Sequence, residues 1–162
     1  MAYGSPASLD DVAAYLMDIR EGRIPSPELV HEMRRRYSLI GGSPLTDLTR
    51  DQARSVEAEL ARRGKSLQVY LGMRHWTPRI QEVVNQMKNE GVTHAVGLVM
   101  APHYSSLSIG KYRKRVEEAK SGINFLFIES WWQQPNFLQA LENRIHTALK
   151  TIPAGAKLKI IF

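Results

Sequence analysis

The feature that most constrains this fold is an alternation of short apolar runs with helical patterns. Residues 67–73, 95–100, 123–128 and 157–162 are apolar runs of strand length, and residues 1–3 form a shorter one. Such continuous apolarity is typical of parallel strands that are covered on both sides, because a half-exposed strand alternates apolar and polar residues. The pattern therefore predicts an α/β fold with a parallel β-sheet flanked by helices on both faces.

The segments between the runs carry start signals for helices. Ser and Thr favour the position just before a helix, and apolar residues at helical spacing indicate a buried stripe. The expected caps are Ser8, Ser26 (followed by Pro27) and, as a capping box, Thr49 with Gln52. Further helices are expected just after Pro78 and over about residues 108–119 and 135–150.

Length and charge narrow the function. The chain has 162 residues, which suits one domain, and its formal net charge is +6. Such a surplus could attract nucleic acid, anionic lipid or a small ligand with several acidic groups. The basic runs at 34–36 and 111–115 lie in helical patterns, where charge usually forms a solvated face, and no aromatic residues interleave a basic stripe. Nucleic acid is therefore not an expected partner.

Composition also bears on location. The chain contains no cysteine, so it has neither disulfides nor a thiolate metal site. No apolar run approaches the roughly 20 residues that span a bilayer, and the first residues lack the pattern of a signal peptide. We therefore expect no transmembrane segment and a cytoplasmic location.

The residues that follow the apolar runs predict a ligand site. Ligands of open parallel sheets bind beyond the carboxyl ends of the strands. At those ends the sequence places a titratable group with an aromatic residue in three cases out of four, and no glycine-rich phosphate loop follows any run. The four ends are Tyr3-Gly4-Ser5-Pro6, Arg74-His75-Trp76, His103-Tyr104-Ser105 and Glu129-Ser130-Trp131-Trp132. This composition favours a flat, conjugated ligand with polar edges over a nucleotide.

His103 is the strongest single candidate. Most loop histidines are satisfied by a backbone carbonyl, but the position after the third apolar run of a parallel sheet favours a functional role. His75 has the equivalent position after the second run, although the neighbouring Arg74 would oppose its protonation.

Arg20, Arg23 and Ser43 allow two interpretations each. Arg20 and Arg23 lie at the end of the first expected helix, where they either compensate the helix dipole or bind carboxylates. The residues alone favour dipole compensation. Ser43 lies in "IGGSPL", which on its own is a turn.

Several longer motifs occur together and in order. They are "MAYGSP", "YLMDIREGRIPSPELV", "RRRYSLIGGSPLTDLTRDQA", "GMRHWTPRI", "LVMAPHYSSLSIGKY" and "ESWWQQPNFLQAL". Together they resemble the N-terminal half of a ferrochelatase, and the likeness runs from residue 1 to the end. Long motifs in the correct order are far more specific than any single short pattern.

The resemblance implies a fold and an activity. Ferrochelatases clamp a porphyrin between two similar α/β domains of chelatase-like (flavodoxin-like) fold, and they insert ferrous iron in haem biosynthesis. The implied substrates are Fe²⁺ and a porphyrin, either protoporphyrin IX or the coproporphyrin III that some Gram-positive relatives use. No tightly bound cofactor is implied.

The resemblance also assigns roles to single residues. The histidine of the "APH" motif is His103, for which it implies catalysis by proton transfer from the pyrrole nitrogens, metal binding, or both. The implied porphyrin-binding residues are Tyr3, Arg20, Arg23, Ser43 and His75.

Two departures from the family are visible. Many relatives have a basic residue where this chain has Glu21, which implies weaker or differently arranged propionate binding. A ferrochelatase is also about twice as long, and its second half carries a glutamate that faces the histidine across the cleft. Residues 1–162 are therefore expected to form an N-terminal chelatase domain, inactive by itself, that self-associates through the face left by the missing half.

Two other functions stay open. Short chelatases act on sirohydrochlorin and dimerise to build a two-walled cleft, but they use a second histidine early in the chain, where this one has Tyr3. A non-catalytic tetrapyrrole-binding domain is the other possibility.

Overall fold

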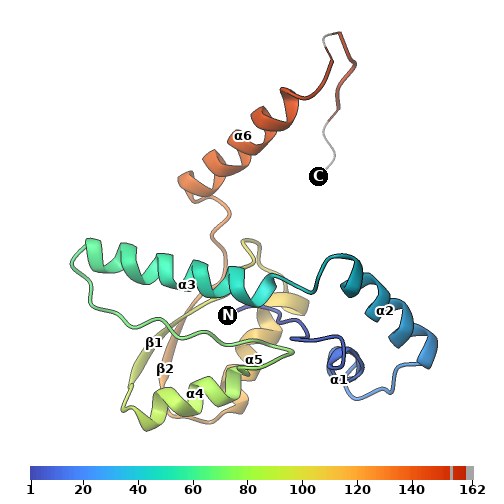
Figure 1. The fold of residues 1–162 in the computed structure, drawn as a ribbon. Coiled ribbons are helices and arrows are strands. Elements are labelled where there is room, and N and C mark those ends of the chain that lie inside the picture. The colour runs from blue at the N-terminus through green and yellow to red at the C-terminus, as the bar shows by residue number, and fades with distance from the viewer. Residues whose placement is uncertain (154, 160–162) are drawn as a thin grey trace. The chain divides into compact units, whose positions relative to one another are not determined.

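The computed structural model describes residues 1–153 and 155–159 (Figure 1). The chain divides into two compact units, one formed by Met1–Glu129 and a smaller one that begins at Ser130. The helices of the first unit are α1 (Val12–Ile19), α2 (Pro27–Leu39), α3 (Leu45–Arg62), α4 (Ile80–Asn89) and α5 (Lys111–Glu118). Its strands are β1 (His94–Leu98) and β2 (Asn124–Ile128), and a π-helical turn, Ser106–Gly110, precedes α5. The second unit carries α6 (Pro135–Leu149). The expected α/β class is confirmed.

β1 and β2 pair in parallel. Their register runs from His94 opposite Asn124 to Leu98 opposite Ile128. Because α5 connects the two strands, this is a strand–helix–strand unit of the kind that parallel sheets require. The prediction of parallel strands near 95–100 and 123–128 is confirmed.

Backbone hydrogen bonds extend this sheet by two short segments. The Ala2 N–H donates to the Gly72 carbonyl at 3.1 Å, and the Ala2 carbonyl accepts from the Arg74 N–H at 2.9 Å. On its other side the N-terminal segment meets the continuation of β1, where the Met100 N–H donates to the Met1 carbonyl at 3.0 Å. If the four segments are numbered by their order along the chain, their order across the sheet is 2-1-3-4, which is that of flavodoxin-like folds.

Two of the expected strands are not formed as predicted. In the run 67–73 only Met73 makes strand-like bridges, to Ala2 and to Arg79. The neighbouring N-terminal segment pairs only at its first residues, so the earlier part of the run has no ladder to join. Of the run 157–162, residues 157–159 are not in a strand, and 160–162 lie outside the described residues.

α4 and α5 cover one face of the sheet and form the core with it (Figure 1). Phe125 and Phe127 of β2 pack against this cluster, and Gly97 of β1 leaves room for the Phe127 ring, which would lie 2.8 Å from an added Cβ atom. The buried members of the cluster are Ile80, Val84, Val99, Ile109, Tyr112 and Val116. The helix predicted after Pro78 thus buries its expected stripe.

The opposite face of β1 and β2 is open among the described residues. Val96 and Leu126 are register partners on that face, and their side chains are 59% and 71% exposed. Helices thus cover the α4–α5 face of the sheet, as expected. On the opposite face the side chains of Val96 and Leu126 are not covered by the described residues.

The helix starts follow the predictions in part. Ser26 caps α2, because its Oγ accepts from the Leu29 N–H at 3.3 Å. The prediction for Ser8 is wrong: α1 starts later, after Asp11, whose carboxylate accepts from the backbone and the hydroxyl of Ser8. The capping box at Thr49 is also wrong, since α3 starts at Leu45 and the buried Thr49 hydroxyl donates to the Leu45 carbonyl within the helix.

Candidate functional site

The site begins where the N-terminal segment and the segment around Gly72 end side by side. The His75 N–H donates to the Tyr3 carbonyl at 2.9 Å, so both residues lie at the carboxyl edge of the sheet. Their rings are 4.5 Å apart between centroids, with 49° between the planes. The N-terminal segment has the segment around Gly72 on one side and β1 on the other, so the order in which strands are added to the sheet changes direction there. This is the topological switch point at which such sheets bind ligands. The predicted placement of Tyr3 and His75 together is confirmed.

His75 is held by a carboxylate from α1. Its Nδ1 lies 2.7 Å from Oδ2 of Asp18, and the other oxygen of Asp18 accepts from the Arg79 guanidinium at 2.8 Å. An ionised carboxylate only accepts, so Nδ1 carries the proton and Nε2 presents a lone pair. The His75 side chain is only 3% exposed, and Nε2 has no hydrogen-bond partner among the described residues.

Burial sets the protonation of His75. Loss of hydration lowers the pKa of its imidazole, whereas the hydrogen bond to Asp18 acts in the opposite direction and the Arg74 charge lowers the pKa further. The net direction is downward, so the ring is neutral at pH 7. The Arg74 charge thus acts in the direction that the sequence argument predicts, and burial is the larger cause of the lowered pKa.

Tyr3 and Arg74 complete this part of the edge. Tyr3 is 42% exposed, so one part of its ring is open to a ligand. The Arg74 guanidinium lies over that ring, with its Cζ 5.7 Å from the centroid, and also over the ring of Tyr112 on α5 at 5.6 Å. The edge therefore joins aromatic faces to a cation.

Arg20 and Arg23 follow α1 near the same edge. The Arg23 Nε donates to the Arg20 carbonyl at 3.1 Å, which satisfies a backbone acceptor after the helix end, as dipole compensation predicts. The Arg20 Nε is buried without a hydrogen-bond partner in the part of the chain that the structure describes. Between them Glu21, with a left-handed φ of 57°, forms an ion pair with Lys111 at 3.0 Å. This bond lowers the pKa of the Glu21 carboxyl.

Ser43 lies in a different hollow. Its Oγ accepts from the Leu45 N–H at 3.3 Å, so the turn interpretation is correct. It also lines a pocket of about 300 Å³. The other lining residues are Pro6, Ala7, Ser8, Leu9, Tyr37, Ser38, Gly41 and Gly42. The pocket follows directly on the Tyr3–Ser5 segment.

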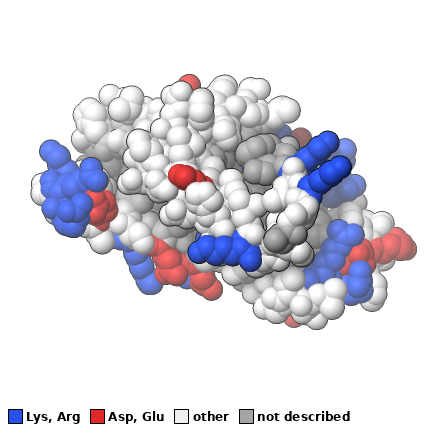
Figure 2. All heavy atoms as spheres, turned by 90° about the horizontal axis from the view of Figure 1, so that it is seen from above, with Lys and Arg blue, Asp and Glu red and all other residues white. Residues whose placement is uncertain are grey.

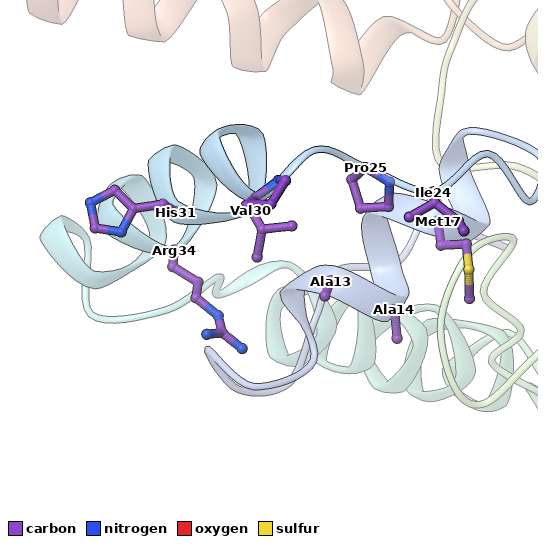
Figure 3. Close-up of a pocket in the computed structure, with 9 residues that line it drawn as sticks. Ala13, Ala14, Met17, Ile24, Pro25, Val30, His31 and Arg34 are labelled. Carbon is purple, nitrogen blue, oxygen red and sulfur yellow. The ribbon is translucent and has the colours of Figure 1, made fainter.

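A larger pocket, of about 600 Å³, lies between α1 and α2 (Figure 3). Figure 3 shows Val30 of α2 pointing toward Ala13 and Ala14 of α1, with Met17 and His31 at opposite ends of the row. None of the predicted site residues lines it. It is a mostly apolar groove between helices.

His103 lies in the loop that follows β1 and is exposed. Because β1 is parallel to the N-terminal segment, this loop leaves the sheet at the same edge as Tyr3 and His75. Among the described residues no three His, Cys, Asp or Glu side chains form a group able to hold a metal ion. A role of His103 in metal binding stays a prediction.

The charged residues are dispersed on the face that Figure 2 shows. On the face drawn in Figure 2, Lys and Arg lie in separate groups, some of them beside Asp and Glu, and that face has no continuous basic stripe. The arginine run 34–36 forms ion pairs along α2, with Arg35 and Arg36 both bonded to Glu32. This run is a solvated helix face, as predicted.

Comparisons with known proteins agree with this geometry. The family model described as Ferrochelatase matches residues 1–162. The chain belongs to the ferrochelatase family. It is 39% identical to a ferrochelatase of Deinococcus radiodurans over 158 residues, which cover 94% of this chain and 50% of that protein. It is 42% identical to a ferrochelatase of Herpetosiphon aurantiacus over 97% of this chain and 53% of the relative.

A third ferrochelatase relative specifies a porphyrin in its name. The coproporphyrin III ferrochelatase of Staphylococcus aureus is 41% identical to this chain over 158 residues, which cover 94% of the chain and 52% of that relative. The chain thus spans about half the length of the curated relatives it matches. No helix among the described residues is long and apolar enough to cross a membrane.

For a ferrochelatase-family chain, sequence reasoning missed the residues that organise this edge. Asp18 is an acid in the last turn of α1, where the helix dipole disfavours negative charge. An acid at such a position indicates that another interaction holds it there, and this could have been noticed in the sequence. Tyr112 gave no signal, because its apolar spacing on α5 is that of an ordinary core residue.

Proposed function

We propose that this chain forms one wall of a porphyrin-binding cleft and takes part in inserting Fe²⁺ into a porphyrin, as a step of haem synthesis. The observation that carries the proposal is the convergence of Tyr3, Arg74 and His75 at the switch point of the sheet in a chain of this family. Family membership supports the reaction class, and the edge supplies the features that a flat, acidic ligand needs.

The edge can bind a porphyrin through two kinds of contact. The open part of the Tyr3 ring offers an apolar face to the macrocycle. Arg20 and Arg23, together with the net charge of +6, attract the carboxylates at its rim. The buried Nε of Arg20 supports this role, because a buried donor without a partner is costly unless a ligand satisfies it.

Within this proposal His103 handles protons and metal. Metallation removes two pyrrole protons while a divalent ion enters, and a neutral imidazole both accepts a proton near pH 7 and ligates Fe²⁺. His103 is exposed at the same edge, whereas the buried His75 already uses Nδ1 to bind Asp18. We therefore assign proton transfer to His103, and to His75 the support of Tyr3.

Coproporphyrin III is the preferred substrate under this proposal. It carries four carboxylates, whereas protoporphyrin IX carries two, and the edge has arginines at three positions, Arg20, Arg23 and Arg74. The name of the Staphylococcus aureus relative supports the same choice. Because the relatives are about twice as long, we expect this wall to act together with a second one.

Porphyrin titration tests the cleft. The 162-residue chain is mixed with coproporphyrin III and with protoporphyrin IX, and binding is followed by the shift of the Soret band. We expect both to bind, coproporphyrin III more tightly, and we expect the preference to shrink with added salt, which screens charge. A chain that is folded by circular dichroism and binds neither porphyrin would contradict the proposal.

Metal insertion by the same chain separates the remaining functions. Zinc insertion is followed by fluorescence while light scattering gives the mass in solution. We expect binding without appreciable insertion by a single wall. Insertion by a dimer would instead favour the short homodimeric chelatase, and robust insertion by a monomer would show that one wall is sufficient.

The role of His103 needs its own variant. In the complete protein that inserts iron, His103→Ala should lower the rate by at least about a hundredfold, as expected for loss of a general base, with porphyrin affinity largely kept. The control is His94→Ala, which removes an exposed histidine at the amino end of β1 whose Nδ1 contacts the hydroxyl of the adjacent Thr93. Unchanged turnover of the His103 variant would remove it from the mechanism.

A further inference from the structure

Arg74 occupies a defined place at the carboxyl edge. Its backbone N–H donates to the Ala2 carbonyl at 2.9 Å, so the residue is anchored by sheet hydrogen bonding. The next residue, His75, bonds to the Tyr3 carbonyl in the same way. The side chain therefore leaves a rigid part of the fold, and its position is set by the sheet rather than by a mobile loop.

Two tyrosine rings hold the guanidinium. Its Cζ lies 5.7 Å from the Tyr3 centroid and 5.6 Å from the Tyr112 centroid, both within the range of cation–π contacts. Tyr112 is only 4% exposed, and burial raises the pKa of its phenol to about 12, so its ring stays neutral. A guanidinium carries five N–H donors in its plane, and these donors can bind a carboxylate while its charge contacts the rings.

Three neighbouring cations are paired with carboxylates, in contrast to Arg74. Arg79 bonds to Asp18 at 2.8 Å, and Lys111 bonds to Glu21 at 3.0 Å. Arg113 bonds to Glu129 at 2.7 Å. Among the described residues no carboxylate lies within 4.0 Å of Arg74, although its charge also acts on the Glu21 carboxylate over a longer distance. The acids close to this edge are used elsewhere.

We propose that Arg74 is a carboxylate-binding residue of this site, which holds one acidic side chain of the tetrapyrrole through the N–H donors of its guanidinium. The inference rests on the proposed porphyrin function and adds a residue to it. A planar fork binds a carboxylate through two parallel hydrogen bonds, and the two rings fix the fork before the ligand arrives. Tyr3 then has a double role, because it contacts the macrocycle and positions the cation.

A purely structural role is the competing explanation. Arg74 would then serve only to join Tyr3 to Tyr112, and its loss would disturb every ligand equally. The two roles differ in how they depend on the acidity of the ligand, so the test compares an acid with its ester.

Arg74→Gln is titrated with coproporphyrin III and with coproporphyrin III tetramethyl ester in the same detergent. We expect affinity for the acid to fall about tenfold, the effect of losing one charge-assisted bidentate contact, and affinity for the ester to stay within about twofold. The matched control is Arg113→Gln, which removes another arginine that lies over a ring, that of Phe127 at 4.8 Å, but one already paired with Glu129. It should leave both affinities within about twofold.

The outcomes separate the two proposals. If the wild-type chain binds neither acid nor ester, the cleft itself fails. If it binds both and Arg74→Gln weakens both equally or neither, the cleft stands and the role of Arg74 is overturned. Should Arg74→Gln fail to fold, Arg74→Lys decides: it keeps the charge but lacks the fork, so a loss of about threefold for the acid alone supports the proposal. Unchanged binding by that lysine variant overturns it.

Discussion

The loop after the segment around Gly72 and the loop after β1 leave the sheet at the same edge, and each carries a histidine. On the first, which we call the His75 side (residues 72–79 with Asp18), the imidazole is buried and bonded to a carboxylate. On the second, the His103 side (residues 101–105), the imidazole is exposed. Under the proposed function this difference predicts separate roles, because a fixed group can position a ligand while an accessible one can exchange protons with it.

The largest effect is expected from Gly4, on the His75 side. Its φ is +91°, and a Cβ atom there would lie 2.9 Å from the backbone nitrogen of Trp76. Gly4→Ala therefore adds a clash with backbone to a strained conformation, and we expect the free energy of unfolding to fall by about 3–5 kcal/mol. Urea denaturation of the chain measures it.

Gly22 provides the matched control for that variant. Its φ is +87°, close to that of Gly4, but an added Cβ would meet no atom within 4 Å. Gly22→Ala should cost only the backbone term, about 1 kcal/mol. Equal losses for the two variants would mean that the close approach to Trp76 contributes nothing, and the His75 side would not be as tightly built as described.

Asp18→Ala comes next in size. It removes the acceptor of both His75 and Arg79 and leaves the buried imidazole donor unpaired, for which we expect a loss of about 2–3 kcal/mol in the free energy of unfolding. His103→Ala on the other side should change stability by less than about 0.5 kcal/mol, as exposed substitutions usually do. Thermal and urea unfolding of both variants test the contrast, which similar losses would break.

Acid titration gives a smaller, separable effect. Burial lowers the pKa of His75 in the folded chain below its ordinary value of 6.5, so as the pH falls below about 6.5 the unfolded chain takes up a proton that the folded chain refuses. Stability is therefore fully present above pH 6.5 and declines below it, by at most about 1.4 kcal/mol per pH unit. Below the folded pKa the decline from this group stops.

The variant His75→Gln isolates that contribution. The difference in unfolding free energy between wild type and variant, measured by urea at pH 7.5, 6.5 and 5.5, should shrink as the pH falls. The α-amino group of Met1, whose pKa burial lowers to about 6, acts in both proteins and cancels in the difference. A difference that is independent of pH would show that the imidazole is protonated equally in both states.

Sequence patterns predicted what is encoded locally. The helix expected after Pro78 is α4, and its apolar residues Ile80, Val83, Val84 and Met87 are all buried, because helical spacing fixes which side chains share a face. Ser26 was found for the same reason, since a cap and its helix are neighbours in the chain. The edge of the sheet at which Tyr3 and His75 meet also followed, because the ends of parallel strands lie on one side.

What the sequence did not reveal depends on contacts between distant residues. Asp18 and His75 are far apart in the chain, and no local pattern pairs them. The run 67–73 has the composition of a strand, but an apolar run becomes a strand only where a partner supplies hydrogen bonds, and here Met73 alone finds one in Ala2. His75 and His103 both follow apolar runs, so their positions in the sequence do not show that the first is buried and the second exposed.

The smallest effect concerns an ion pair that joins the two sides. Glu21 follows α1, which supplies Asp18 to the His75 side, and its partner Lys111 begins α5 shortly after the His103 loop. The pair is exposed, so Lys111→Gln should change the stability of the fold little. Its local consequence should nevertheless be visible: amide hydrogen exchange within residues 101–110 should quicken by about two- to fivefold, while the amides of Arg74 and His75, held by sheet hydrogen bonds, stay unchanged. Lys114→Gln is the control, because it removes a neighbouring lysine whose contact with Glu118 stays within α5. Faster exchange on both sides would mean that the two regions open as one unit and that the His75 side is no more rigid than its neighbour.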